Sequence, residues 1–152
     1  MRNSPLSMLL ALTLATTGAL AHDDAHELPF GRPGIASDAT RTIAVSMSDA
    51  MRFEPAEIHV RPGETVRFVV SNTGRLRHEF VLGTMRELRE HAEAMRKFPG
   101  MEHHEPHMAT VAPGGMATLV WRFTKPGTFH YACLEPGHLE AGMAGRIVVS
   151  AR

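Results

Sequence analysis

Several residue types are scarce in this chain of 152 residues, which contains one Cys, one Trp and one Tyr. The single Cys, Cys133, excludes an internal disulfide. The 16 Lys and Arg residues balance the 16 Asp and Glu residues, which argues against a general electrostatic hold on nucleic acid or anionic lipid. There is no Gly-rich phosphate loop, nucleophile elbow or H-E-x-x-H motif, so no familiar catalytic motif points to an enzyme.

Histidine and methionine, by contrast, are abundant, with 10 residues of each. Imidazole and thioether groups bind transition metals. The chain is 43% apolar, which is enough for a packed core, and its length suits one domain. The composition therefore indicates a single folded domain with many metal-binding side chains.

The N-terminus has the three parts of an export signal. Arg2 supplies the positive charge, residues 6–15 form an apolar run, and Ala19-Leu20-Ala21 is a small-x-small cleavage site. The apolar run is shorter than the ~20 residues that a membrane-spanning helix needs. We predict that residues 1–21 are a signal peptide removed on export, with no membrane insertion after cleavage.

The rest of the chain divides into an arm and a domain. Residues 22–39 are polar, contain two Pro and show no periodicity, which predicts a flexible His-containing arm. Residues 40–152 contain short runs rich in Val, Ile, Phe and Thr, separated by turn residues, which predicts an all-β fold, a β-sandwich. The runs are 42–47, 56–60, 65–71, 78–82, 117–123, 128–133 and 145–150.

One helix is predicted between two of these strands. Thr84 and Glu87 have the spacing of a capping box, and residues 98–100, Phe-Pro-Gly, end the helical pattern. Apolar positions recur between them at helical intervals. They are Met85, Leu88, Ala92 and Met95.

The most specific pattern is C-x4-H-x4-M, formed by Cys133, His138 and Met143 between two strand-like runs. Thiolate, imidazole and thioether are copper ligands, and two His with one Cys and a weak Met is the geometry of electron-transfer copper sites. His78, which opens the run HEFVL, supplies the second imidazole if its strand neighbours the loop. Zinc, the alternative metal, gains little from a thioether. Taken singly, Cys133 could be a buried thiol and His138 an ordinary loop histidine. These interpretations do not explain why the two occur together with Met143 at this spacing.

The segments RHEFVLG and FHYACLEPGHLEAGM resemble the ligand-bearing segments of the cupredoxins, the small blue copper proteins. The resemblance extends from about Thr42 to the end of the chain. It implies a Greek-key β-sandwich with a type 1 copper held strongly by His78, Cys133 and His138 and axially by Met143. Many electron-carrier cupredoxins have Asn directly after the first His ligand, where this chain has Glu79, so the resemblance does not extend to potential or colour.

Within the cupredoxins, the chain is most similar to the periplasmic copper-tolerance proteins of bacteria, because of its long insertion after strand 78–82 and its His-containing arm. This implies a periplasmic, monomeric, non-enzymatic protein that binds copper and exchanges single electrons with a transient redox or copper-handling partner. The alternative is a dedicated soluble electron carrier between respiratory proteins. An enzyme ranks last because a four-ligand site has no open position for substrate.

The surplus of His and Met leaves a second copper site open. Surface His-rich tracts also bind metal only loosely, and Met on a helix also packs against a sheet, so the sequence does not decide between these alternatives. The candidate residues are His22, His26, His91, Met95, His103, His104, His107 and Met108.

Overall fold

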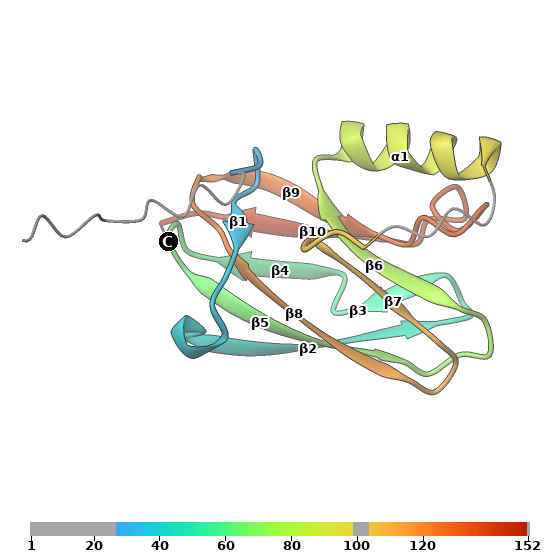
Figure 1. The fold of residues 1–152 in the computed structure, drawn as a ribbon, viewed down its shortest axis with the longest axis horizontal. Helices are drawn as coiled ribbons and strands as arrows, with labels where there is room; N and C mark the ends of the chain where they lie inside the picture. The colour runs from blue at the N-terminus through green and yellow to red at the C-terminus, as the bar shows by residue number, and fades with distance from the viewer. Residues whose placement is uncertain (1–26, 99–103, 152) are drawn as a thin grey trace, which may run out of the picture.

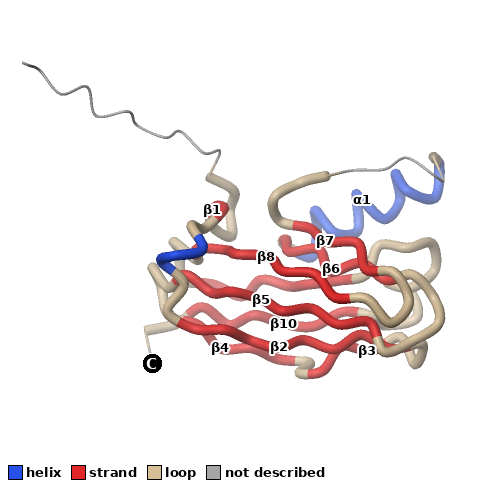
Figure 2. The backbone as a smooth tube through the Cα atoms, turned by 60° about the horizontal axis from the view of Figure 1, so that its bottom comes forward, coloured by secondary structure: helices blue, strands red, loops and turns tan. Residues whose placement is uncertain are grey.

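Two five-stranded β-sheets packed face to face form the body of the molecule (Figures 1 and 2). The computed structural model describes residues 27–98 and 104–151. The first sheet contains β1 (Arg32–Pro33), β2 (Arg41–Ser48), β3 (Arg52–Glu54), β5 (Thr65–Asn72) and β8 (Met116–Arg122). The second contains β4 (Glu57–Val60), β6 (His78–Gly83), β7 (Met108–Val111), β9 (Gly127–Ala132) and β10 (Ala144–Val149). The strand orders are β1-β8-β5-β2-β3 and β4-β10-β9-β6-β7.

The core lies between the sheets and follows the alternation of the strands. In β5, Val66, Phe68 and Val70 are fully buried, because successive side chains of a strand point to opposite faces. Phe68 reaches Phe80 of the facing sheet, with ring centroids 5.3 Å apart. The β-sandwich prediction is confirmed, and each of the predicted runs overlaps a strand. The strands β1 and β3 went unpredicted because two or three residues show too little alternation. The four residues of β7 do not alternate between buried and exposed, whereas the four residues of β4 do.

The predicted helix is α1 (Met85–Lys97), and it begins with the predicted capping box. The Glu87 amide donates to Thr84 Oγ1 at 3.3 Å, and the Thr84 amide donates to the Glu87 carboxylate at 3.0 Å. Leu88 and Ala92 are buried against Val81 of β6 and the end of β9, so α1 covers part of the second sheet (Figure 1). In the described part of the chain, no helix is both long and apolar enough to cross a membrane.

The N-terminal segment differs from the flexible arm predicted over residues 22–39. Its described part, from residue 27 onward, is packed on the sandwich because Phe30 is 2% exposed and stacks on Trp121 with ring centroids 5.2 Å apart. Trp121 Nε1 donates to the Phe30 carbonyl at 3.0 Å, and β1 pairs with β8. The segment is held by one aromatic residue, Phe30, and by the two paired residues of β1. Such isolated contacts produce no periodic pattern, so the sequence did not predict them. The predicted signal peptide, His22 and His26 lie outside the described residues.

Candidate metal centre

The order of the second sheet brings His78 to the loop that follows β9. β6 and β9 are antiparallel neighbours, with Val81 opposite Ala132. His78 is the first residue of β6, so it lies beside the residues that follow Ala132. The strand of His78 therefore neighbours the ligand loop, which was the condition for His78 to supply the second imidazole.

Three of the four predicted ligand side chains converge at this point. Cys133 Sγ lies 3.9 Å from His78 Nδ1 and 3.2 Å from His138 Nδ1. One ligand atom from each residue lies within 4.8 Å of the other two, and the two imidazole rings are 5.1 Å apart between centroids. His78 and Cys133 are fully buried, whereas His138 is partly exposed. Among the described His, Cys, Asp and Glu side chains, this is the one group of three or more that comes close enough to hold a metal.

Met143, the fourth predicted ligand, closes the loop. Its side chain is fully buried in the same core cluster as Cys133. The Cys133 amide donates to the Met143 carbonyl at 3.1 Å, and the Met143 amide donates to the His138 carbonyl at 3.0 Å. The loop from residue 133 to 143 is thus drawn together by its own backbone, with Met143 returning to the position of Cys133.

Contacts from outside the loop also fix its shape. Arg52 of β3 donates to the Ala141 carbonyl at 3.1 Å, and Arg77, directly before β6, pairs with Glu135 at 2.6 Å. Within the loop, Gly137 has a φ of 87°, a left-handed conformation that glycine adopts without a Cβ penalty. The backbone before His138 therefore turns sharply and carries the imidazole back toward Cys133.

The burial of Cys133 disfavours its thiolate unless a cation lies beside the sulfur. Burial raises the pKa of its thiol to about 12, against the opposing effect of the Glu79 and Glu135 amides. The Glu79 amide lies 3.3 Å from Sγ. A thiol with this pKa is protonated at neutral pH, so a metal must displace the proton and then stabilises the thiolate.

The two imidazoles complete a donor set suited to copper. Burial, followed by the charge of His78, lowers the pKa of His138, which favours the neutral imidazole that binds metals. A soft sulfur suits Cu(I), and imidazole serves both Cu(I) and Cu(II). The residues present therefore fit copper, and the buried thioether of Met143 adds a second soft sulfur.

Glu79, the departure from the family pattern, connects the strand of His78 to its neighbours. The residue is 5% exposed, and Thr110 Oγ1 of β7 donates to its carboxyl group at 3.4 Å. Burial, followed by the charge of Glu135, raises the pKa of Glu79 against the opposing charge of Arg77 and the hydrogen bonds from Thr110 and the Leu134 amide. Glu79 thus joins β6, β7 and the ligand loop through side-chain hydrogen bonds.

Asp49 is a site residue that sequence reasoning missed. Its Oδ1 lies 3.2 Å from His78 Nε2, the ring nitrogen on the far side from Cys133. Asp49 sits in the turn between β2 and β3 and has no motif around it. Only the packing of the two sheets shows that this turn meets the start of β6, so the sequence carried no usable signal.

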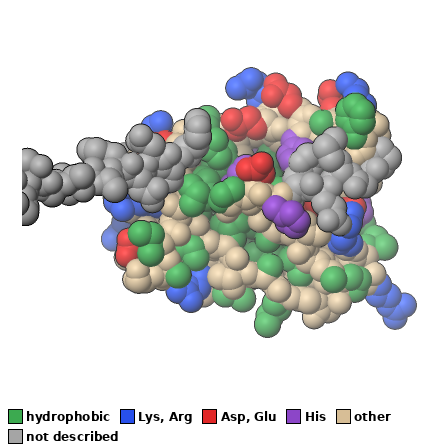
Figure 3. All heavy atoms as spheres, viewed as in Figure 1, with side chains coloured by type: hydrophobic (Ala, Val, Ile, Leu, Met, Phe, Trp, Pro, Cys, Tyr) green, Lys and Arg blue, Asp and Glu red, His purple; other side chains and the backbone are tan. Residues whose placement is uncertain are grey.

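Two of the second-site candidates lie on one groove of about 200 Å³. His91 of α1 and His107, just before β7, line it together with Glu87. Figure 3 shows histidine and acidic side chains gathered on this face near α1. His107 packs edge-on against Phe30 and Trp121, with ring centroids 5.7 and 6.1 Å away. Burial lowers the pKa of His107.

The remaining candidates are dispersed. Met95 is buried on the packed face of α1, where a packing role accounts for it. Met108 begins β7 and is partly buried against the apolar cluster that contains Leu88 and Ala92 of α1. His104 is exposed, and His103 lies outside the described residues. The second copper site therefore stays a hypothesis from the sequence.

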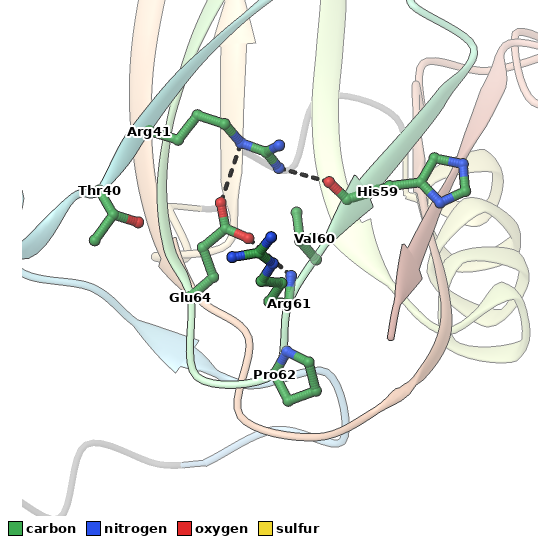
Figure 4. Close-up of a pocket in the computed structure, with 7 residues that line it drawn as sticks. All are labelled: Thr40, Arg41, His59, Val60, Arg61, Pro62 and Glu64. Atoms are coloured by element: carbon green, nitrogen blue, oxygen red, sulfur yellow. Dashed lines mark hydrogen bonds and ion pairs between the residues drawn. The ribbon is translucent and has the colours of Figure 1, made fainter. Parts of the chain in front are cut away.

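A wider surface hollow of about 680 Å³ is lined by none of the predicted ligands (Figure 4). Its charged groups satisfy one another: Arg41 pairs with Glu64 at 3.1 Å and donates to the His59 carbonyl at 2.6 Å. The His59 ring pairs with Glu57 at 2.7 Å. Among the described residues, the group that could hold a metal is His78, Cys133 and His138, and none of these lines the hollow.

Comparison with known proteins agrees with this geometry. The model of a family described as copper binding proteins, plastocyanin/azurin family, matches residues 40–150. A copper-resistant cuproprotein CopI from Rubrivivax gelatinosus is 56% identical over 135 residues, which cover 89% of this chain and 81% of the relative. CopI from Pseudomonas aeruginosa is 35% identical, with 95% of each chain covered.

Solved structures show the same fold. Auracyanin B is similar with a TM-score of 0.65 and 20% identity, covering 79% of this chain and 96% of that chain. Reduced auracyanin from Roseiflexus castenholzii is similar with a TM-score of 0.62 and 23% identity, covering 73% of this chain and 98% of that chain. With a family match over most of its length and a metal centre of two histidines and a cysteine, the chain belongs to the plastocyanin/azurin family of copper-binding proteins, the cupredoxins.

Proposed function

We propose that this chain is an exported cupredoxin that serves copper tolerance in the periplasm. Its copper site consists of His78, Cys133, His138 and Met143. The observation that carries the proposal is a buried thiol whose sulfur lies 3.9 and 3.2 Å from the Nδ1 atoms of two imidazoles. Two relatives at 56% and 35% identity bear the name copper-resistant cuproprotein, which supports a role in tolerance.

In this proposal the loop holds the ligands in place, and His138 connects the copper site to the surface. Copper bound here supplies one-electron chemistry between Cu(I) and Cu(II). Backbone hydrogen bonds and the Arg52 and Arg77 contacts fix the ligand loop, so its ligand atoms are held in place for both oxidation states. His138 is the partly exposed member of the set and gives the site its contact with the surface.

The surface around His138 suits brief contact with a partner. Pro136 and Gly137 are exposed and Leu139 is partly exposed, so small and apolar residues flank His138 along the loop. Redox partners bind through small, weak interfaces. We propose that a redox or copper-handling protein docks here and exchanges an electron through His138.

Export through residues 1–21 places the mature protein in the periplasm in this proposal. The signal-like sequence supports it: a positive charge, an apolar run of ten residues from 6 to 15, and a small-x-small site. N-terminal sequencing of the protein from a periplasmic extract tests it. A first residue of His22 is expected, and an uncleaved chain in the membrane fraction would contradict it.

Growth in copper tests the role in tolerance. A copper-sensitive bacterial strain would express the exported full chain, its Cys133→Ser variant, or a His59→Gln control at matched periplasmic levels. His59 is an exposed histidine outside the site, so its variant should protect as the wild type does. Cys133→Ser should lose the protection because the site loses its thiolate. Equal growth of the Cys133→Ser and wild-type strains would contradict the proposal.

A dedicated electron carrier is the second candidate, and one observation favours it. The described residues contain a single complete metal-binding group, which is all that an electron carrier needs. This function predicts slower respiration in a deletion strain of the source bacterium at low copper. The copper-tolerance function predicts normal respiration there and a growth defect only when copper is added.

A further inference from the structure

A carboxylate faces the side of His78 that is turned away from Cys133. His78 Nδ1 is directed at Cys133 Sγ at 3.9 Å, and Nε2 lies 3.2 Å from Asp49 Oδ1. An imidazole that binds a metal through Nδ1 carries its proton on Nε2. The Nε2–H group would then donate to the Asp49 carboxylate. With copper bound, His78 would link the carboxylate to the metal.

Two backbone amides hold the Asp49 carboxylate in place. Asp49 Oδ2 accepts from the Arg75 amide at 2.8 Å, and Oδ1 accepts from the Leu76 amide at 3.2 Å. The turn closes on the carboxylate only because residue 74 is glycine, since a Cβ there would collide with Asp49 Oδ1. The Asp49 carboxylate is therefore held in one orientation, beside His78 Nε2.

We propose that Asp49 is a positioning residue that fixes the tautomer and orientation of His78 and favours Cu(II) over Cu(I) at the site. The proposal rests on the function of His78 as a copper ligand. A carboxylate on the second nitrogen makes an imidazole a more basic ligand, and negative charge near the metal stabilises the more highly charged ion. The Asp49 side chain is 37% exposed, so solvent reduces the effect without removing it.

The reduction potential of the copper protein, purified after export of the full chain, tests the proposal. Asp49→Asn removes the charge and keeps the shape. We expect the ratio of Cu(II) to Cu(I) affinity to fall about tenfold, which raises the potential by about 59 mV. Asp38→Asn is the matched control, because Asp38 is exposed and lines a surface hollow with Thr65 and Arg122 that includes none of the predicted ligands. Its potential should equal that of the wild type.

Nitrogen NMR of the metal-free protein gives a readout that needs neither copper nor a stable variant. The proposal predicts that the neutral His78 ring carries its proton on Nε2, in slow exchange with water. In Asp49→Asn, the ring should shift toward a mixture of the two tautomers. A wild-type His78 ring protonated on Nδ1 would overturn the proposal even if Asp49→Asn did not fold.

The two proposals fail in different ways. If wild-type protein binds copper at Cys133 and Asp49→Asn leaves the potential unchanged, the role of Asp49 is refuted and the copper site stands. If the wild-type protein binds no copper through Cys133, the proposed function and the role of Asp49 are both refuted.

Discussion

Truncation of Leu88 tests how firmly α1 is attached beside the copper loop. Leu88 is 2% exposed and packs with Val81, Ala132 and Leu134, the last two of which flank Cys133. Leu88→Ala removes three buried carbons at about 0.8 kcal/mol each, or about 2.4 kcal/mol of transfer free energy. The cavity left behind adds to this. We expect the free energy of unfolding to fall by about 3 kcal/mol, within the range of about 2–5 kcal/mol typical of buried Leu→Ala changes.

Guanidinium unfolding of the copper-free protein measures the effect. Leu76→Ala is the matched control, because Leu76 is 47% exposed and the same truncation there should change the free energy of unfolding by less than about 0.5 kcal/mol. If Leu88→Ala were no less stable than Leu76→Ala, the reasoning that places α1 on the second sheet through Leu88 would be refuted.

Two further predictions concern stability. Trp121→Phe removes the donor to the buried Phe30 carbonyl, so the free energy of unfolding should fall by about 1–3 kcal/mol; a change under about 0.5 kcal/mol in denaturant unfolding would contradict this. Burial, followed by the charges of Arg146 and Arg89, lowers the pKa of His130, so the unfolded chain takes up this proton near pH 6.5 while the folded chain does so only at lower pH. The free energy of unfolding should therefore fall as pH drops below about 6.5, and His130→Gln should reduce that slope in unfolding curves between pH 5 and 7.5; identical slopes would count against it.

The strands, the helix and the ligand loop could be predicted because their determinants are local. Alternating apolar residues define β5, and the capping box at Thr84 defines the start of α1. The spacing of Cys133, His138 and Met143 lies within one loop, so it could be recognised without the fold.

The remaining features depend on contacts between distant segments. Asp49 reaches His78 across 29 positions of sequence, and Phe30 reaches Trp121 across 91. Neither pair shows periodicity or a motif. For the same reason, the sequence predicted a flexible arm where residues from 27 onward are anchored by Phe30.

The visible absorption spectrum and the copper content of the exported protein test the central claim most directly. The wild-type protein should show an intense thiolate-to-copper band with about one copper per chain, and Cys133→Ser should lack the band. A wild-type protein without this band, or a Cys133→Ser variant that keeps it, would contradict the assignment of Cys133 as a copper ligand.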